Sequence, residues 1–218
     1  MTRARAPERA GAGGRPLGVA EAVRRIQRPV FTTREIASLR GASASGTTQA
    51  LARLAREGAI VAVTRGLWCD PSDASFTPFA LVPFLAGGHR AYVSLLSALH
   101  LYGVLSQIPQ SIFAATTGHT RVVRTPFGEF SFHQMSPDFF AGFDWYGSAQ
   151  QFLVATREKA LVDCLYLASR KGSRFRYFPE LDLGKPFRVS AAREWIARIR
   201  DPRIRAFAGK ELKRITTR

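Results

Sequence analysis

Residues Ser45–Trp68, with the sequence SGTTQALARLAREGAIVAVTRGLW, contain two patterns in succession. Up to Arg56 the apolar residues recur at the spacing of an amphipathic helix. Beyond Gly58 they alternate on either side of a Thr-Arg-Gly turn, as they do in a β-hairpin. The arginines of the helix have two interpretations, contact with a polyanion or simple exposure to water, and the rest of the chain has to decide between them.

The helical part of this stretch separates into two faces. With Gln49 placed at zero and each residue turning about 100°, Ser45, Arg53 and Arg56 fall within about 40° of it. Thr47, Leu51 and Leu54 fall on the opposite side, between about 140° and 200°. We therefore expect the leucines to pack inward and the polar residues, separated by the small Ala52, to face outward.

Two further helices are predicted before this one. Val19–Gln27 places Val19, Ala22, Val23 and Ile26 on one face, and Pro29 ends it. Phe31–Gly41 has a threonine suited to an N-cap, a short helical pattern and a terminal glycine. The order helix, short helix, helix and two-stranded wing predicts a winged helix-turn-helix over residues 18–70.

A helix-turn-helix of this kind presents side chains that can read DNA. Gln pairs bidentately with adenine and Arg with guanine in the major groove. A helix N-terminus can hold a phosphate, and an arginine at a wing tip can reach a phosphate or the minor groove. The predicted DNA contacts are Thr32, Thr33, Arg34, Ser45, Thr48, Gln49, Arg53, Arg56 and Arg65. A winged helix used for protein contacts is the alternative.

The charge distribution favours a nucleic-acid partner. Of the net charge of +16, residues 1–70 carry 12 Lys/Arg against 5 Asp/Glu, residues 71–169 carry 5 against 6, and residues 170–218 carry 15 against 5. The 27 Arg against 5 Lys indicate a compositional bias, but bias does not explain the shortage of acidic residues at the two ends. No segment combines this basic charge with a lipid-facing stripe, so nucleic acid is favoured over a membrane.

Several other classes of protein are disfavoured. No apolar run reaches the roughly 18 residues of a transmembrane helix, and the N-terminus lacks the apolar region of a secretory signal. Residues 1–17 read as a disordered basic arm. Cys69 and Cys164 lie far apart with no clustered histidines, which predicts two reduced thiols, no metal and no cofactor in a cytoplasmic protein.

Beyond residue 70 the pattern changes to that of a larger mixed α/β domain, residues 71–218. It is expected to hold a small, mostly antiparallel sheet with flanking helices, and to end in a basic helical tail, so that the chain as a whole is α+β. The predicted strands are Ser111–Thr116, Arg121–Arg124, Phe127–His133 and Gln150–Ala155. The predicted helices are Phe76–Ala86, Val93–Tyr102, a helix capped by Thr156 that runs to about Leu167, Ser190–Ile199 and Ile204–Ile215.

No catalytic constellation stands out in this domain. It has no phosphate-binding loop, no dinucleotide-binding glycine motif, no HExxH and no GxSxG, so we expect that it is not an enzyme. His100 reads as a partly buried histidine and His133 lies at a strand end. His119 in a turn before Arg121 and Arg124 could grip a phosphate, although plain surface exposure is favoured.

The remaining polar and aromatic residues are interpreted structurally. Lys159 and Asp163, four residues apart on a helix, are expected to form a weak surface pair. Phe130 and Phe132 alternate with Glu129 and Ser131 as in a half-buried strand. The other aromatic residues of 127–146 are expected to belong to the core rather than to a stacking platform for bases.

The chain resembles the AbiEi-type antitoxins of abortive-infection, type IV toxin–antitoxin systems. The resemblance begins with the Thr33–Trp68 winged helix, which ends in a Trp after Arg-Gly. It continues through the stretches AYVSLLSALHLYG (91–103), SIFAATTG (111–118), TPFGEFSFH (125–133) and ATREKALVDCLY (155–166), in the family's order. It covers about residues 28–183, and the arm of residues 1–17 and the arginine-rich end after Gly184 depart from it.

The resemblance implies a two-domain antitoxin. Its winged helix would bind operator DNA and repress its own operon, and its C-terminal domain would counteract a nucleotidyltransferase toxin without a stable toxin complex. Lys159 and Asp163 match the family motif, but no chemistry can be assigned to them. Two alternatives stay open: a regulator with no toxin partner, and a winged helix fused to a nucleic-acid-processing enzyme domain.

Overall fold

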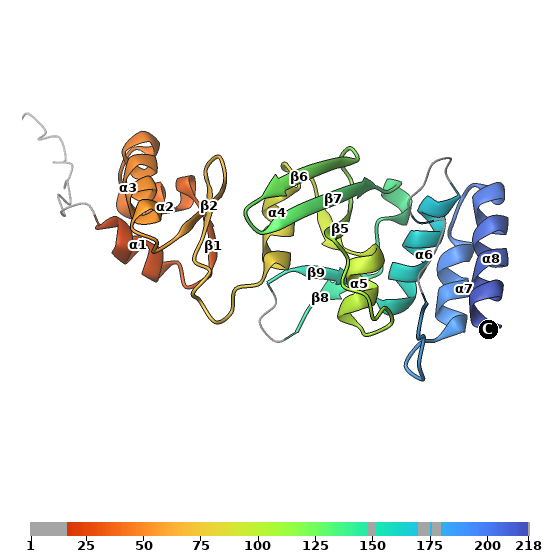
Figure 1. Cartoon of the computed structure of the whole chain (residues 1–218). Coiled ribbons are helices and arrows are strands. Elements are labelled where there is room, and N and C mark those ends of the chain that lie inside the picture. The colour runs from red at the N-terminus through yellow and green to blue at the C-terminus, as the bar shows by residue number, and fades with distance from the viewer. Residues whose placement is uncertain (1–16, 148–150, 170–174, 176–179, 218) are drawn as a thin grey trace, which may run out of the picture. The chain divides into compact units, whose positions relative to one another are not determined.

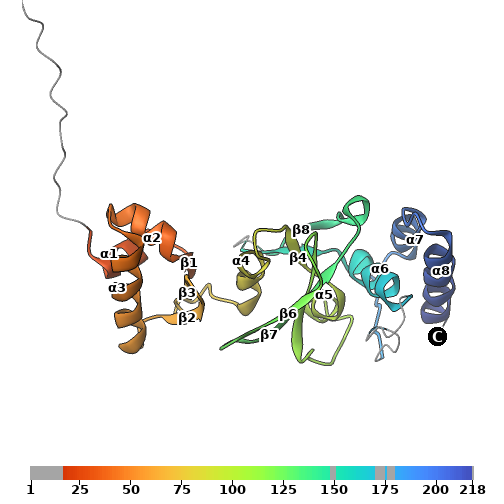
Figure 2. The same ribbon diagram turned by 90° about the horizontal axis from the view of Figure 1, so that it is seen from above.

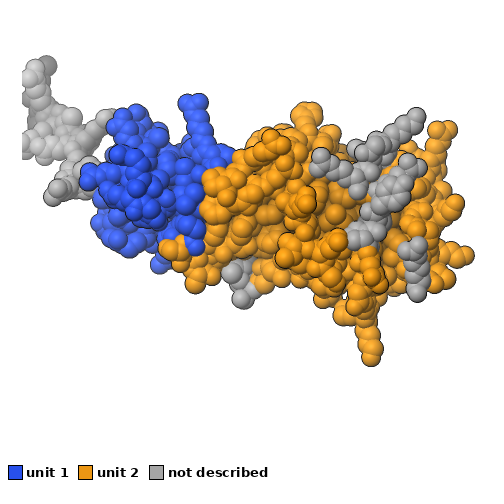
Figure 3. All heavy atoms as spheres, in the orientation of Figure 1, with its two compact units in different colours: residues 1–71 blue, residues 72–218 orange. Residues whose placement is uncertain are grey.

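The computed structural model describes residues 17–147, 151–169, 175 and 180–217. The chain divides into two compact units, Met1–Pro71 and Ser72–Arg218 (Figure 3). Most of the predicted disordered arm, residues 1–16, lies outside the described residues.

The first unit contains the three predicted helices and one strand more than predicted. The helices are α1 (Val19–Arg25), α2 (Thr33–Arg40) and α3 (Ala44–Arg56), and the strands are β1 (Val30–Thr32), β2 (Val61–Thr64) and β3 (Leu67–Cys69) (Figure 1). The strands form an antiparallel sheet in the order β1-β3-β2. The predicted two-stranded wing is therefore part of a three-stranded sheet. The sequence did not predict β1 because three residues are too few to show a periodicity.

The ends of α2 follow from the capping residues in the sequence. The Thr32 hydroxyl accepts a hydrogen bond from the Glu35 amide, and the Glu35 carboxylate accepts one from the Thr32 amide at 2.7 Å, which completes a capping box. Gly41 ends the helix with φ at 62°, in the left-handed region that a glycine enters without steric cost. The turn into α3 is thus fixed by local chemistry.

The core of the first unit joins all three helices to the sheet. Its buried residues are Ala22, Phe31, Ile36, Leu51, Ile60 and Trp68. Two polar links support it. The Trp68 indole N–H donates to the Thr33 hydroxyl at 2.8 Å, and Arg40 donates to the Leu17 carbonyl and to the Thr47 hydroxyl. Arg40 therefore holds α2 against the start of α3.

The second unit is built on a six-stranded sheet in the order β6-β7-β5-β4-β9-β8. The strands are β4 (Ala91–Val93), β5 (Ser111–Thr116), β6 (Arg121–Thr125), β7 (Gly128–Gln134), β8 (Phe143–Trp145) and β9 (Leu153–Ala155). The β4–β9 and β5–β7 pairs are parallel and the other three pairs are antiparallel. The predicted strands Ser111–Thr116, Arg121–Arg124 and Phe127–His133 are confirmed to within one residue, whereas the predicted strand Gln150–Ala155 begins only at Leu153. The three-residue strands β4 and β8 were not predicted.

The helices of the second unit differ from the prediction mainly near its start. Predicted as one helix, Phe76–Ala86 is instead a 3₁₀ turn, η1 (Pro78–Leu81), followed by the short α4 (Val82–Leu85). The residues before α5 (Leu95–Leu101) form strand β4, so Val93 is not helical. A second 3₁₀ turn, η2 (Pro137–Phe139), follows β7. The later helices α6 (Arg157–Ala168), α7 (Val189–Ala197) and α8 (Pro202–Thr216) agree with the predicted ones.

Helix α6 lies at the centre of the second unit. It contacts α5 on one side and α7 and α8 on the other (Figures 1 and 2). Every residue from Glu158 to Ala168 is buried, so the predicted apolar face is only part of a helix that is covered all round. Strand β7 is also covered on both faces, since Ser131 is buried along with Phe130 and Phe132.

The predicted aromatic core is confirmed in part. Phe130, Phe132, Phe139 and Phe140 are buried. Phe127, Phe143 and Tyr146 are only half-buried, although Tyr146 stacks on Phe152. Trp145 is 50% exposed at the edge strand β8 and does not belong to the core. Among the described helices, none is long and apolar enough to cross a membrane.

Candidate nucleic-acid interface

Helix α3 presents the predicted polar face to solvent. Ser45, Thr48, Gln49, Arg53 and Arg56 are all exposed. On the opposite side Thr47 and Leu51 have no exposed surface, while Leu54 is half-buried against the core. The predicted orientation of the helix is confirmed. Contact of these side chains with DNA stays a prediction.

The exposed side chains of α3 are held loosely. The Thr48 hydroxyl donates to the Ala44 carbonyl at 2.9 Å, and Ser43 rather than Ser45 caps the helix by accepting from the Gly46 amide. Arg53 pairs with Glu57 at 3.0 Å, with both side chains more than half exposed. Such exposed pairs contribute little free energy, so Arg53 can exchange Glu57 for a base edge or a phosphate.

The hairpin between β2 and β3 carries Arg65 at its tip. The two-residue turn is Arg65-Gly66, and Gly66 has φ at 76°, which a side chain would strain. The Gly66 carbonyl accepts a hydrogen bond from the Thr33 amide at 2.9 Å, so the wing is tied to the first residue of α2. Arg65, the first residue of this anchored turn, is exposed where the sequence predicted a wing residue.

The N-terminus of α2 does not offer the phosphate site that was predicted there. Thr33 is buried and its hydroxyl is taken by Trp68, and the Thr32 hydroxyl is taken by the capping box. The Glu35 carboxylate already occupies the anion position at this helix end. Partial burial opposes its ionisation, but bonds from Thr32 and Arg28 hold the pKa of Glu35 below its usual value. Thr32 and Thr33 are therefore structural, and only the exposed Arg34 remains a candidate on α2.

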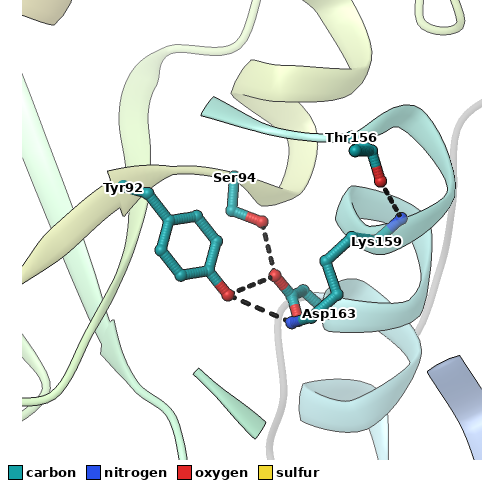
Figure 4. Close-up of polar contacts among 5 residues, drawn as sticks. All are labelled: Tyr92, Ser94, Thr156, Lys159 and Asp163. Carbon is teal, nitrogen blue, oxygen red and sulfur yellow. Dashed lines mark hydrogen bonds and ion pairs between the residues drawn. The ribbon is translucent and has the colours of Figure 1, made fainter. Parts of the chain in front are cut away.

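The second unit contains a buried polar cluster, which Figure 4 shows. The Lys159 ammonium pairs with one oxygen of the Asp163 carboxylate and donates to the Tyr92 hydroxyl at 3.1 Å. The other carboxylate oxygen accepts from Tyr92 at 3.0 Å and from Ser94 at 2.7 Å. Lys159 and Asp163 have no exposed surface, so the predicted weak surface pair is wrong. Spacing along one helix shows that two residues can meet, but only the surrounding elements decide whether water reaches them.

The environment of this cluster is that of a structural site. The Lys159 ammonium lies 4.0 Å from the centre of the Phe139 ring and 5.4 Å from that of Trp195. Burial lowers the pKa of Lys159, against the opposing effect of Asp163, and burial beside Asp163 raises the pKa of Tyr92. Each polar side chain in the cluster has a partner inside it. The four residues therefore join β4 and the start of α5 to α6.

The other polar candidates of the second unit do not form a common site. His119 is exposed, Arg121 donates to the Leu85 carbonyl and stacks on Phe132, and Arg124 pairs with Glu129. His100 is partly buried, as predicted, with Nδ1 at 3.1 Å from the Leu105 carbonyl. His133 lies against Ser131. The described residues hold no group of His, Cys, Asp and Glu that could bind a metal ion.

The two cysteines are buried and unpaired. Burial raises the pKa of Cys69 to about 12 and that of Cys164 well above its usual value. Both thiols are therefore protonated at neutral pH and are poor nucleophiles.

The first unit is a helix-turn-helix domain of the DNA-binding type. It has three helices, the third with an exposed polar face, and a wing with an arginine at its tip. Residues 20–69 match the protein family described as "Transcriptional regulator, AbiEi antitoxin". The match confirms the resemblance to AbiEi-type antitoxins over these residues and supports DNA-binding regulation as the general function of this unit. No curated protein matches the chain. The family match ends at residue 69 and does not extend into the second unit.

The capping role of Thr32 can be separated from a phosphate-binding role. Thr32→Ala removes the capping box, so the free energy of unfolding should fall by about 1 kcal/mol. The affinity for DNA at a fixed salt concentration should not change, because the Thr32 hydroxyl is already bonded to Glu35 within the capping box. Denaturant melts and gel shifts measure the two effects. Thr48→Ala, whose hydroxyl bonds to the Ala44 carbonyl of its own helix, is the stability control. A loss of DNA affinity in Thr32→Ala under conditions where the domain is folded would restore Thr32 as a phosphate ligand.

The buried pair should couple strongly in a double-mutant cycle. Asp163→Asn leaves the Lys159 ammonium without its carboxylate, so the second unit should lose about 3–5 kcal/mol of stability. The double variant Lys159→Met/Asp163→Leu should lose much less stability than the sum of the losses in Lys159→Met and in Asp163→Leu, because no buried charge remains. Glu21→Gln, which breaks the exposed pair with Arg25, should change stability by less than about 0.5 kcal/mol. Additive losses across the cycle would contradict the buried pairing.

Proposed function

We propose that the first unit represses the chain's own operon by binding its operator. The exposed face of α3 supports this proposal, because one side of the helix is anchored by Leu51 and the other carries one amide and two guanidinium groups. Gln49 would pair with adenine, and Arg53 or Arg56 with guanine, in the major groove. Arg34 and Arg65 would contact phosphates on either side, and Ser45 and Thr48 would contribute hydroxyl contacts.

We propose that the second unit counteracts a nucleotidyltransferase toxin through a functional effect rather than a stable complex. The support is the resemblance carried by residues 91–103, 111–118, 125–133 and 155–166. In the second unit these stretches form β4, α5, β5, β7 and α6, and the first and last of them hold the Tyr92–Asp163 cluster together. We further propose that this unit is not an enzyme and that the protein works in the cytoplasm, where its DNA is.

Operator binding should depend on the exposed face of α3. Replacement of Gln49, Arg53 and Arg56 by Ala should abolish the sequence-specific shift on the DNA upstream of the gene, with the fold unchanged because none of the three is buried. Removal of each arginine that touches a phosphate should reduce the salt slope of the affinity by about 0.9. Gel shifts across a salt series measure both. Arg25→Ala, an exposed arginine on α1, should leave specific binding intact. Wild-type protein that shows no preference for its own upstream DNA would refute the repressor.

Antitoxin activity should survive the loss of DNA binding. The same triple variant, expressed from a heterologous promoter together with the nucleotidyltransferase toxin of the proposed system, should restore growth as well as the wild type does. The Asp163→Asn variant should fail to do so, because the second unit is destabilised. Growth rescue is measured, with the level of each protein as the control. A triple variant that binds no operator and also rescues no growth would place the antitoxin activity in the first unit.

A further inference from the structure

A groove between α7 and α8 has features that the proposed function does not use. Its volume is 360 Å³, and its floor is formed by Ile196 and Leu212, which are almost completely buried. The small residues Ala197, on α7, and Gly209, on α8, also line it. The floor is therefore apolar and open to the approach of another backbone.

Cations stand on both walls of this groove. Arg193 lies on α7, and Arg205 and Lys213 lie on α8, all exposed. None of the described residues that line the groove is acidic. One guanidinium nitrogen of Arg205 donates to the Ile199 carbonyl at 3.1 Å, which leaves its other donors free. Arg205, Gly209 and Lys213 follow one face of α8, so the two cations are about 12 Å apart along the helix.

Gly209 has no packing reason to be a glycine. It lies in the middle of α8, where alanine is the better helix former, and a Cβ built on it meets no atom within 4 Å. Its backbone conformation is helical, so no left-handed φ requires it either. The absence of a side chain there deepens the groove between Arg205 and Lys213. This points to a ligand that comes close to the backbone of α8.

We propose that this groove binds an acidic amphipathic helix of a partner protein. An apolar stripe of such a helix would cover Ile196 and Leu212, and carboxylates two turns apart would face Arg205 and Lys213, with Arg193 on the other side. Small residues at the contact allow two helices to approach closely. The inference does not depend on the operator or on the identity of the toxin.

The lining distinguishes this occupant from a nucleic acid. A phosphate backbone in the groove would lie over an apolar floor that offers it no hydrogen-bond donor. The described lining also contains no aromatic ring or side-chain amide that could hold a base. Charge complementarity and an apolar floor together fit a helix that carries both carboxylates and apolar side chains.

Site-specific photocrosslinking in the full chain tests the groove. A photoreactive amino acid replaces Ala197, which is exposed in the groove, or Ala206, which is exposed on α8 outside it. After irradiation in the native host, the crosslinked peptide is sequenced. An adduct at position 197 but not at 206, to a segment with acidic residues flanking a helical apolar stripe, is the expected result. Adducts to nucleic acid alone, to a basic or uncharged segment, or to nothing would overturn the proposal.

Two variants separate charge from shape. Arg205→Glu with Lys213→Glu should lower the yield of the adduct by about tenfold or more, because like charges then face each other. Gly209→Leu should lower it as well by filling the groove, while circular dichroism shows that α8 is retained. Arg203→Glu with Lys210→Glu, both exposed on α8 but outside the groove, changes the net charge by the same amount and is the matched control. Equal losses with this control would show that the effect is general electrostatics and would reject the groove.

Discussion

The larger unit depends on the ion pair between Lys159 and Asp163. An ammonium with no exposed surface is stable only if its charge is paired and its hydrogen bonds are made. Asp163 supplies the charge, and Tyr92 and Ser94 complete the cluster from β4 and the residue after it. Since Tyr92 and Ser94 lie about 70 residues before Asp163 in the chain, the complete cluster can form only when α6 has docked on the sheet.

This requirement accounts for two local irregularities. The Ser94 hydroxyl donates to Asp163 and so makes no cap for α5, and the next residue, Leu95, has φ at 57°, in a region that costs a leucine free energy. Gly142 approaches so closely that a Cβ there would lie 2.5 Å from the Trp195 ring and 3.0 Å from the Lys159 side chain. The strain at Leu95 is compatible with a stable fold because the buried pair fixes the junction between β4 and α5.

The sequence predicts elements whose signals are local and fails where contacts are distant. The two faces of α3, the capping of α2 and the extent of α6 to α8 follow from periodicity and capping residues. The burial of Lys159 and Asp163 does not, because a four-residue spacing looks the same on a surface helix and on one enclosed by α5, α7 and α8. Strands β1, β4 and β8 have three residues each, which is too few to display alternation.

For single polar residues among the candidate DNA contacts, too, the sequence does not show which distant side chain they contact. Thr32 and Thr33 belong to the residue types that bind phosphates, and they also belong to those that cap helices and bond to buried indoles. Only the position of Trp68, 35 residues away in the sequence from Thr33, decides between the two roles. Arg40 is a similar case, since its donors are used within the first unit and it differs from Arg53 and Arg56 only in its neighbours.

The basic residues of the chain therefore differ in what they can recognise. A general excess of Lys and Arg raises affinity for any polyanion and carries no sequence information. Sequence discrimination requires hydrogen bonds in fixed geometry to base edges, and on α3 Gln49 and the neighbouring arginines can make them in pairs. The cations around the α7–α8 groove flank an apolar floor instead, which a phosphate backbone leaves uncovered and a partner with both carboxylates and apolar side chains would cover. The two basic ends of the chain thus suit different partners.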